Sequence, residues 1–317
     1  MASRRGHGHL RARQGAAPPR RSPCRVRMKI VVLGASGLVG SHVMSAGLAS
    51  GHDVVGTTRA ADSPILRRLE LGDLGATVEL LESERPEAVI YAAGWTWVDG
   101  CEADPSRSRR ENFEQPLAVA RWCEQRGVRV LYYSSSYVFD GVAGGYSEED
   151  LVSPVNVYGR HKADAEKAIL DAAGGAALVA RLICVWGREA ARKNFAYQVM
   201  RAAEGAATLS LPSDQRGNPT WAGDIADWSV RLCASASAGI WHLAGPYPDL
   251  TRPDWAKRIL LGLASVGRPA DVSFDVRTTS EIRPPAARPL RAGMSTAKVQ
   301  RFHPVVCREP EDLPRDF

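Results

Sequence analysis

The length and composition of the chain fit one wide α/β domain, or a main domain with a smaller lobe, and exclude several other classes. It has 317 residues, 44% of them hydrophobic and 24% charged, which is enough to bury a large core. No apolar run reaches the roughly 18 residues of a membrane span. The six cysteines are scattered and form no CxxC pair, so we expect no disulfide framework, no metal site and a reducing cytoplasmic setting.

The net charge of +6 comes from one end of the chain. Residues 1–27 contain eight arginines and no acidic residue, and the rest of the chain is slightly acidic. We therefore expect no specific nucleic-acid surface on the folded body. The segment lacks the apolar stretch of a secretory signal and is predicted to be a disordered basic extension, with a transit peptide as the alternative. Met28, which directly precedes the first predicted strand, is the candidate natural start.

The first half of the body alternates apolar strands with amphipathic helices. A strand over 29–33 passes through a glycine turn into a helix over 38–48, and a strand over 53–57 follows. The later expected elements are helix 76–83, strand 88–91, helix 107–126, strand 128–133, helix 156–173 and strand 177–184. This alternation predicts a Rossmann-like, doubly wound parallel sheet over 28–184. Regularity weakens afterwards, and residues 185–317 are expected to form a smaller C-terminal substrate lobe.

The turn after the first strand has the glycine spacing of a dinucleotide site. One glycine suits the tight turn, one lets the backbone approach a pyrophosphate, and one lets the helix pack on the strand. A helix N-terminus also attracts anions. The residues expected to bind the cofactor here and after the strand over 88–91 are Gly34, Ser36, Gly37, Leu38, Val39, Gly40, Ala92, Ala93 and Gly94.

The end of the second strand favours NADPH over NADH. NAD sites usually place an acid there to bind the ribose 2′-hydroxyl, but this strand ends Thr57-Thr58-Arg59. A cation suits a 2′-phosphate, so Thr58 and Arg59 are assigned to the cofactor, with a solvated loop charge as the alternative. Asp73 and Leu74 are expected near the adenine, although Asp73 has the alternative role of capping the next helix.

Tyr158 and Lys162 carry the predicted chemistry. Four residues apart on a helix, they share one face, and the ammonium is expected to lower the pKa of the phenol by favouring the phenolate. Ser134-Ser135-Ser136 ends the preceding strand and offers a hydroxyl to a carbonyl oxygen. The predicted catalytic residues are Ser135, Tyr158 and Lys162, with Ser136 as the rival of Ser135. This set predicts hydride transfer to or from a carbonyl.

Five segments extend this interpretation to a family. They are 92–102 (AAGWTWVDGCE), 137–141 (YVFDG), 154–159 (PVNVYG), 214–220 (DQRGNPT) and 241–245 (WHLAG). With them the chain resembles the extended short-chain dehydrogenase/reductases, and within these the dTDP-4-dehydrorhamnose reductase group, from about Met28 to Lys298. Where that group usually has Ser-Thr-Asp, this chain has three serines, and the two tryptophans near 95 also suggest an altered pocket.

The resemblance implies NADPH-dependent reduction of the 4-keto group of a nucleotide-linked 4-keto-6-deoxyhexose. It also implies a substrate-binding set of Trp95, Thr96, Val98, Ser136 and Trp221, for whose tryptophans packing is the alternative. A homodimer is the candidate assembly. Dehydratases of the wider family have an acidic pair where this chain has Ser136-Tyr137, and epimerases keep NAD bound, so both are disfavoured. A non-catalytic NADP-binding regulatory subunit is the rival of another class.

Overall fold

A computed structural model describes residues 27–60, 63–173, 176–205 and 209–312. The predicted basic extension therefore lies, apart from residue 27, outside the described residues. Within the described ranges, no helix has both the length and the apolar character needed to cross a lipid bilayer.

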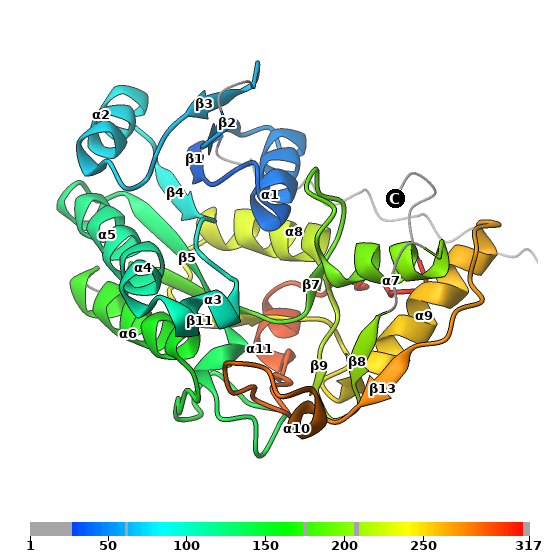
Figure 1. The fold of residues 1–317 in the computed structure, drawn as a ribbon. Coiled ribbons are helices and arrows are strands. Elements are labelled where there is room, and N and C mark those ends of the chain that lie inside the picture. The colour runs from blue at the N-terminus through cyan, green and yellow to red at the C-terminus, as the bar shows by residue number, and fades with distance from the viewer. Residues whose placement is uncertain (1–26, 61–62, 174–175, 206–208, 313–317) are drawn as a thin grey trace, which may run out of the picture.

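The body is built on a seven-stranded sheet in the order β11-β6-β5-β4-β1-β2-β3, with every pair parallel (Figure 1). This is a doubly wound arrangement: strand order runs outward in both directions from β1, and ligands bind where it reverses. The strands are β1 (Lys29–Leu33), β2 (Asp53–Thr58), β3 (Leu66–Arg68), β4 (Ala88–Tyr91), β5 (Arg129–Ser135), β6 (Leu178–Leu182) and β11 (Gly239–Leu243).

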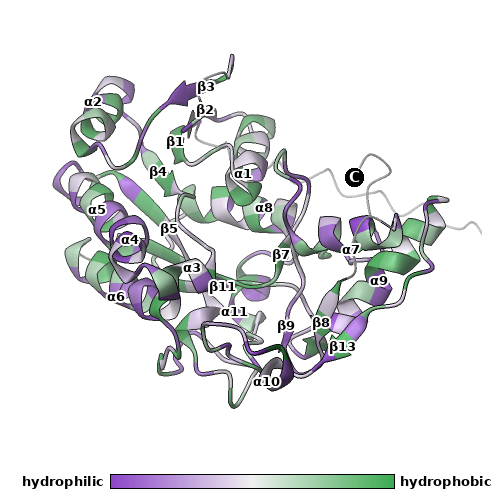
Figure 2. Ribbon diagram, in the orientation of Figure 1, coloured by the Kyte–Doolittle hydropathy of each residue, from purple (hydrophilic) through white to green (hydrophobic). Residues whose placement is uncertain are grey.

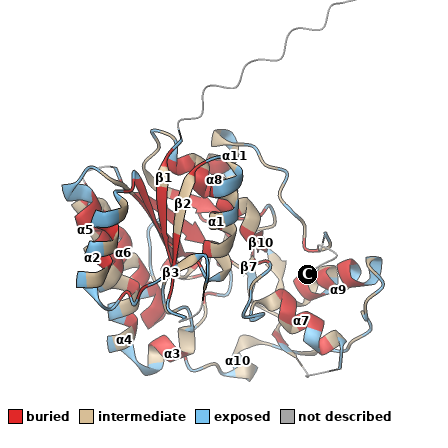
Figure 3. Ribbon diagram, turned by 90° about the horizontal axis from the view of Figure 1, so that it is seen from above, coloured by how far each residue is buried: buried red, intermediate tan, exposed pale blue. Residues whose placement is uncertain are grey.

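Helices cover both faces of this sheet, so its central strands are apolar on both sides (Figures 2 and 3). Ile30 and Val32 of β1 belong to the core beneath one helix layer, and Val31 and Leu33 to the core beneath the other. The first layer comprises α1 (Leu38–Ala49), α8 (Ala222–Cys233) and α11 (Ala297–Phe302), and the second α2 (Leu74–Glu84), α5 (Gln115–Gln125) and α6 (Val157–Ala172).

The helix predicted over 107–126 is three segments. It consists of α4 (Pro105–Arg109), a π-helical segment (Arg110–Glu114) and α5, preceded by α3 (Val98–Ala103). A π-helical insertion widens one turn and is frequent at functional sites. It carries Asn112, a fully buried residue.

A second body of structure follows β6 and has its own aromatic core. Trp186, Trp255 and Val199 are among its buried residues. The elements are β7 (Val185–Trp186), α7 (Phe195–Ala203), β8 (Ser210–Pro212), β9 (Arg216–Gly217), β10 (Thr220–Trp221), β12 (Leu250–Thr251), α9 (Arg252–Ser265), β13 (Asp275–Arg277) and α10 (Thr279–Ile282).

The sequence analysis divided the chain once, at 184/185, and placed all later residues in this lobe. In the structure the chain leaves the lobe again. Residues 222–243 return to the sheet, where α8 packs against α1 and β11 adds an edge strand beside β6. The α11 helix then packs on β11. Pairing between β6 and β11 joins residues some 60 positions apart, so no local pattern in the sequence announces it.

Candidate active site

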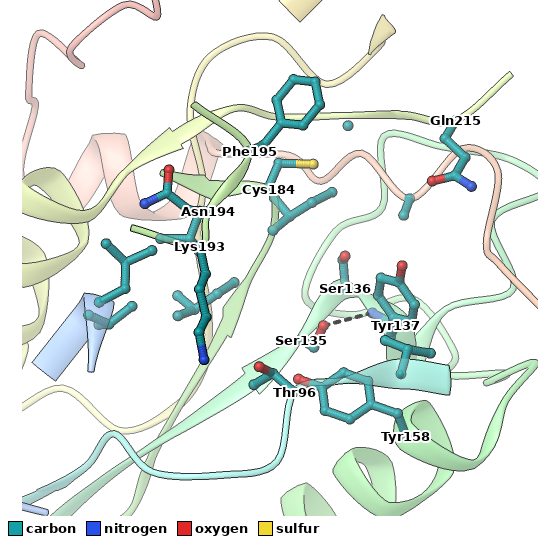
Figure 4. Close-up of a pocket in the computed structure, with 18 of the residues that line it drawn as sticks. Thr96, Ser135, Ser136, Tyr137, Tyr158, Cys184, Lys193, Asn194, Phe195 and Gln215 are labelled. Atoms are coloured by element: carbon teal, nitrogen blue, oxygen red, sulfur yellow. Dashed lines mark hydrogen bonds between the residues drawn. The ribbon is translucent and has the colours of Figure 1, made fainter. Parts of the chain in front are cut away.

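A cavity of about 760 Å³ lies between the carboxyl edge of the sheet and the lobe. Ser135, Tyr158 and Lys162 line it from the sheet side, together with Gly37 and Ala93. Figure 4 shows Ser135, Tyr158 and Thr96 on one side of this space and Phe195 and Gln215 on the other, with the Lys193 side chain extending into it. The three residues predicted to be catalytic are therefore brought together.

A smaller cavity of about 300 Å³ adjoins the first. Gly37 and the backbone of Ala92–Gly94 line both spaces. Ser36, Thr58 and Arg59 line only the smaller one, which lies over the ends of β1 and β2. An elongated ligand that crosses the glycine turn therefore has one compartment on each side of it.

Two glycines of the turn have the geometry that their spacing predicts. Gly34 has φ +89°, and a Cβ there would lie within 3.0 Å of the backbone of Ala92 and Ala93. A Cβ on Gly40 would lie 2.3 Å from the Gly34 carbonyl oxygen, so its absence lets α1 pack on the turn. A Cβ on Gly37 would lie 3.4 Å from the Gly34 carbonyl oxygen, an ordinary contact, and Gly37 lines both cavities. Leu38 and Val39 line the larger cavity.

Asp73 takes the alternative role that the sequence left open. Its Oδ1 accepts a hydrogen bond from the backbone N–H of Ala76 at 2.9 Å and caps α2. Neither Asp73 nor Leu74 lines either cavity. Leu69, Glu70 and Leu71 do so at the smaller one, among residues that the sequence analysis did not single out.

Tyr158 reaches Ser135 because Gly159 lets α6 approach the end of β5; we refer to α6 as the catalytic helix because it carries the predicted catalytic residues Tyr158 and Lys162. A Cβ on Gly159 would lie 2.1 Å from the carbonyl oxygen of Tyr137. Asn156 caps the helix, accepting from the Gly159 N–H at 2.8 Å. Ser135 Oγ accepts from the Tyr137 N–H at 3.2 Å (Figure 4). This bond fixes the Ser135 side chain beside Tyr158.

The electrostatics differ from the expectation that Lys162 lowers the pKa of the phenol. Burial raises the pKa of Tyr158 above its ordinary value, and a hydrogen bond with Ser135 only partly opposes this. Burial also lowers the pKa of Lys162 to about 7. Its Nζ donates to the Tyr133 carbonyl at 2.9 Å and lies 5.8 Å from the centroid of the Tyr158 ring. The arrangement therefore holds Tyr158 as a protonated phenol.

One acid on the same helix acts on Lys162. Glu166, one turn further along α6, favours the charged form of the lysine and raises its pKa against the effect of burial. Glu166 itself is buried and accepts from Arg181 of β6 through both carboxylate oxygens, at distances of 2.7 to 3.2 Å. The ion pair joins the catalytic helix to the sheet directly behind the serines.

The predicted substrate residues divide into two groups. Thr96, Val98 and Ser136 line the larger cavity, but Trp95 and Trp221 do not. The guanidinium of Arg107 lies 4.1 Å from the centroid of the Trp95 ring. Trp221 packs edge-on against Trp186, with ring centroids 4.7 Å apart. Both tryptophans thus take the packing role that was their alternative.

The lobe supplies cavity residues that the sequence analysis did not assign to the site. Three cations, Lys193, Arg216 and Arg252, line it. Arg252 lies 5.3 Å from the Phe195 ring centroid and 5.1 Å from that of Trp255. Gln215 and Arg216 fall in the DQRGNPT segment that carries the resemblance, which was the available signal. Nothing in the sequence distinguishes Lys193 from a surface lysine.

The segment 286–292 forms part of the cavity wall. Asp99 of α3 accepts from the Ala286 N–H at 3.1 Å and from Arg288 at 2.7 Å. Asn156 donates to the Ala287 carbonyl at 2.8 Å. These bonds hold residues 286–288 against α3 and the N-terminus of α6. Pro289 and Ala292, which follow, line the cavity.

Comparisons with known proteins agree with this fold. The family model described as the RmlD substrate binding domain matches residues 28–312. A probable low-salt glycan biosynthesis reductase of Haloferax volcanii is 31% identical, over 86% of this chain and 91% of the relative. A dTDP-4-dehydrorhamnose reductase of Burkholderia thailandensis is 30% identical, over 87% and 93%.

Among solved structures, a dTDP-4-dehydrorhamnose reductase of Bacillus anthracis in complex with NADP superposes with a TM-score of 0.80. At 20% identity, covering 90% of this chain and 97% of that one, it confirms the fold. The family model and the two relatives confirm the resemblance seen in the sequence. The chain belongs to the RmlD substrate-binding-domain family of extended short-chain dehydrogenase/reductases.

Proposed function

We propose that this protein is an NADPH-dependent ketoreductase that reduces the 4-keto group of a nucleotide-linked 4-keto-6-deoxyhexose. The observation that carries the proposal is the convergence of Ser135, Tyr158 and Lys162 in one cavity, directly beside the glycine turn. Two relatives with reductase names support it, including a dTDP-4-keto-6-deoxy-D-glucose reductase of Streptomyces niveus that is 30% identical over 74% of this chain.

The residues at the glycine turn fit a dinucleotide. Gly37 and the Ala92–Gly94 backbone face both cavities and leave room for a pyrophosphate between them. Arg59 and Ser36 line the smaller cavity, where a cation and a hydroxyl suit a ribose 2′-phosphate, and no acid stands at the Thr57-Thr58-Arg59 end of β2. Bound NADPH would supply the hydride.

The chain's own residues polarise the carbonyl and supply the proton. Ser135 and Tyr158 donate hydrogen bonds to the C4 carbonyl oxygen. Because the pKa of Tyr158 is raised, the phenol keeps its proton until an alkoxide, which is far more basic, forms beside it. Tyr158 then acts as the general acid. Lys162, buried beside the ring, would hold the nicotinamide ribose of a bound cofactor and would stabilise the tyrosinate that remains.

The nucleotide part of the substrate belongs at the lobe end of the cavity. Lys193, Arg216 and Arg252 supply positive charge for a diphosphate. Phe195 supplies apolar ring surface for a base. Binding energy gained there from the unreactive part of the substrate positions C4 at Tyr158.

The alternatives differ from this proposal at specific residues. Ser136-Tyr137 stands where a dehydratase has its acidic pair, and the Thr57-Thr58-Arg59 end of β2 lacks the acid of an NAD-retaining epimerase. A regulatory subunit would need NADP binding without Tyr158 chemistry. We also propose a cytoplasmic location and a homodimer, which fractionation and gel filtration test.

The experiment is an NADPH-oxidation assay with a dTDP-4-keto-6-deoxyhexose prepared from dTDP-glucose by a dehydratase. We expect substrate-dependent oxidation, faster with NADPH than with NADH, and an alcohol at C4 in the product by NMR. Protein that binds NADPH tightly but consumes none with dTDP-, UDP- or GDP-linked keto sugars would contradict the proposal and favour the regulatory subunit.

A further inference from the structure

The catalytic helix carries a histidine that the proposed reaction does not use. His161 lies between Tyr158 and Lys162 in the sequence but points to α4, where its Nδ1 is 2.8 Å from the hydroxyl oxygen of Ser108. Ser108 is completely buried, whereas His161 is half-buried. Buried polar groups are generally hydrogen-bonded, so the other partners of the Ser108 hydroxyl show which part of the site it supports.

Ser108 holds the side chain of Asn112, one turn further on in the π-helical segment. Asn112 Nδ2 donates to Ser108 Oγ at 3.3 Å and to the carbonyl oxygen of Trp95 at 3.0 Å. Its Oδ1 accepts from the Trp95 N–H at 3.1 Å. Asn112 thus pairs with both backbone groups of one residue, much as a neighbouring strand would.

The hydrogen bonds along this path have one consistent direction. Ser108 Oγ accepts from Asn112, which leaves its single proton available for His161 Nδ1, 2.8 Å away. This direction corresponds to the imidazole tautomer that has its proton on Nε2. Removing the imidazole leaves a buried hydroxyl without that acceptor, and Ser108 then gains by turning toward another group. The Asn112 amide then keeps its hydrogen bonds with Trp95 but loses the Ser108 oxygen that helps to fix its position.

Trp95 lies in the loop that forms one wall of the substrate cavity, although its own side chain does not line the cavity. Residues 92–94 precede it and line both cavities, and Thr96 and Val98 on its other side line the larger one. A Cβ on Gly94 would lie 2.9 Å from Asn112 Oδ1 and 3.7 Å from Lys162 Nζ, so the Asn112 amide also borders the catalytic lysine. The position of the 92–98 loop therefore depends on the Asn112 amide.

We propose that Ser108 and His161 are positioning residues, which lock the Asn112 amide onto Trp95 and thereby set the substrate-facing wall formed by Thr96 and Val98. The expected change in KM rests on the proposed function. The expected change in the position of the 92–98 loop rests on the hydrogen bonds alone. Neither residue touches substrate or cofactor.

The test uses His161→Leu, Ser108→Ala and the double variant in the full-length protein. For each single variant we expect the KM for the keto-sugar nucleotide to rise about two- to tenfold, the cost of one hydrogen bond. The Kd for NADPH should change by less than about twofold. The double variant should be no worse than the worse single one, because both act through one bond. His161→Asn, whose amide oxygen can occupy the place of Nδ1, should restore the KM.

A second measurement needs neither substrate nor cofactor. Hydrogen–deuterium exchange of a peptide spanning 92–98 should quicken in both single variants, because the Trp95 N–H loses a fixed acceptor, and should recover in His161→Asn. The matched control is Lys167→Leu, which breaks an exposed ion pair with Asp171 on the same helix and should change neither readout.

Unchanged exchange in the 92–98 peptide overturns the proposal whether or not the protein is a reductase. A lower melting temperature with unchanged KM overturns it as well, because that result assigns the pair to stability alone. Faster exchange in a protein inactive on every keto-sugar nucleotide would support the positioning role and contradict the proposed function, so the two failures are distinguishable.

Discussion

The two walls of the cavity are built in different ways. The sheet-side wall comes from the ends of β1, β4 and β5 and the first turns of α6, where Gly34, Gly40 and Gly159 permit backbone approaches that no side chain would allow. The lobe-side wall is assembled from residues near 193, 216 and 252, which come together only through the packing of α7, α9 and the short strands. In the proposed function, the first wall carries out the reaction, and the second determines which substrate binds.

The largest effect should follow a change in the sheet-side wall. Tyr158→Phe removes the general acid and keeps the ring, so kcat should fall by about 10²–10⁴ while the Kd for NADPH stays nearly constant. Stopped-flow or steady-state NADPH oxidation, with fluorescence titration of the cofactor, measures both quantities. Tyr137→Phe, on the ring 5.7 Å away, is the comparison and should lose far less. Near-normal turnover of Tyr158→Phe would remove this residue from the mechanism.

The smaller cavity should govern the choice of cofactor. A charge-assisted hydrogen bond contributes about 1.5–3 kcal/mol, so Arg59→Ala should weaken NADPH binding by about tenfold to more than a hundredfold. NADH binding should change little, so the preference for NADPH over NADH should become smaller. The ratio of kcat/KM with NADPH to kcat/KM with NADH measures this preference. Arg67→Ala, on the exposed strand β3 beside it, is the control, and equal ratios for both cofactors in the unchanged protein would refute the assignment.

Changes in the lobe-side wall should alter affinity for substrate rather than chemistry. Lys193→Met and Arg252→Met should each raise the KM for the nucleotide-linked sugar by about tenfold or more, on the same charge-assisted scale. The kcat at saturation should stay within about threefold, since uniform binding is what is lost. A fall in kcat at unchanged KM would show that the two walls do not divide their tasks in this way.

A further prediction concerns the proton that Lys162 carries. With a folded-state pKa of about 7 against 10.5 for an ordinary lysine, Lys162 is charged in both folded and unfolded protein below pH 7. Between about 7 and 10.5 only the unfolded chain holds that proton, so this group's contribution to the free energy of unfolding rises with pH there. Lys162→Met should flatten the rise.

Cofactor binding should reverse part of that shift. An anionic dinucleotide favours the charged lysine, so NADPH binding near pH 8 should take up a fraction of one proton. Calorimetry in two buffers that differ in ionisation enthalpy measures the uptake, and Lys162→Met should abolish it. Equal binding enthalpies in both buffers would show that Lys162 already carries its charge.

The sheet-side wall of the cavity could be predicted from the sequence to a larger extent than the lobe-side wall. The Gly34–Gly40 turn and the Tyr158/Lys162 pair were predictable because their spacing alone places them on a strand end and a helix face. The direction of the Tyr158 pKa shift was predicted wrongly, because the spacing of two residues contains no information on how deeply both are buried. Lys193 and the edge strand β11 could not be predicted, since each owes its place to contacts between distant parts of the chain.

The repeated return of the chain to the sheet limits how the protein can be remodelled. Because α8, β11 and α11 belong to the sheet body, the lobe is made of two separate insertions, residues 185–221 and 244–296, and not of one detachable unit. Recombination at a single crossover near residue 184 would therefore replace an edge strand and two helices of the nucleotide-binding body as well. A change of substrate specificity by exchange of segments has to graft both insertions together, whereas point substitutions in the lobe wall leave the sheet intact.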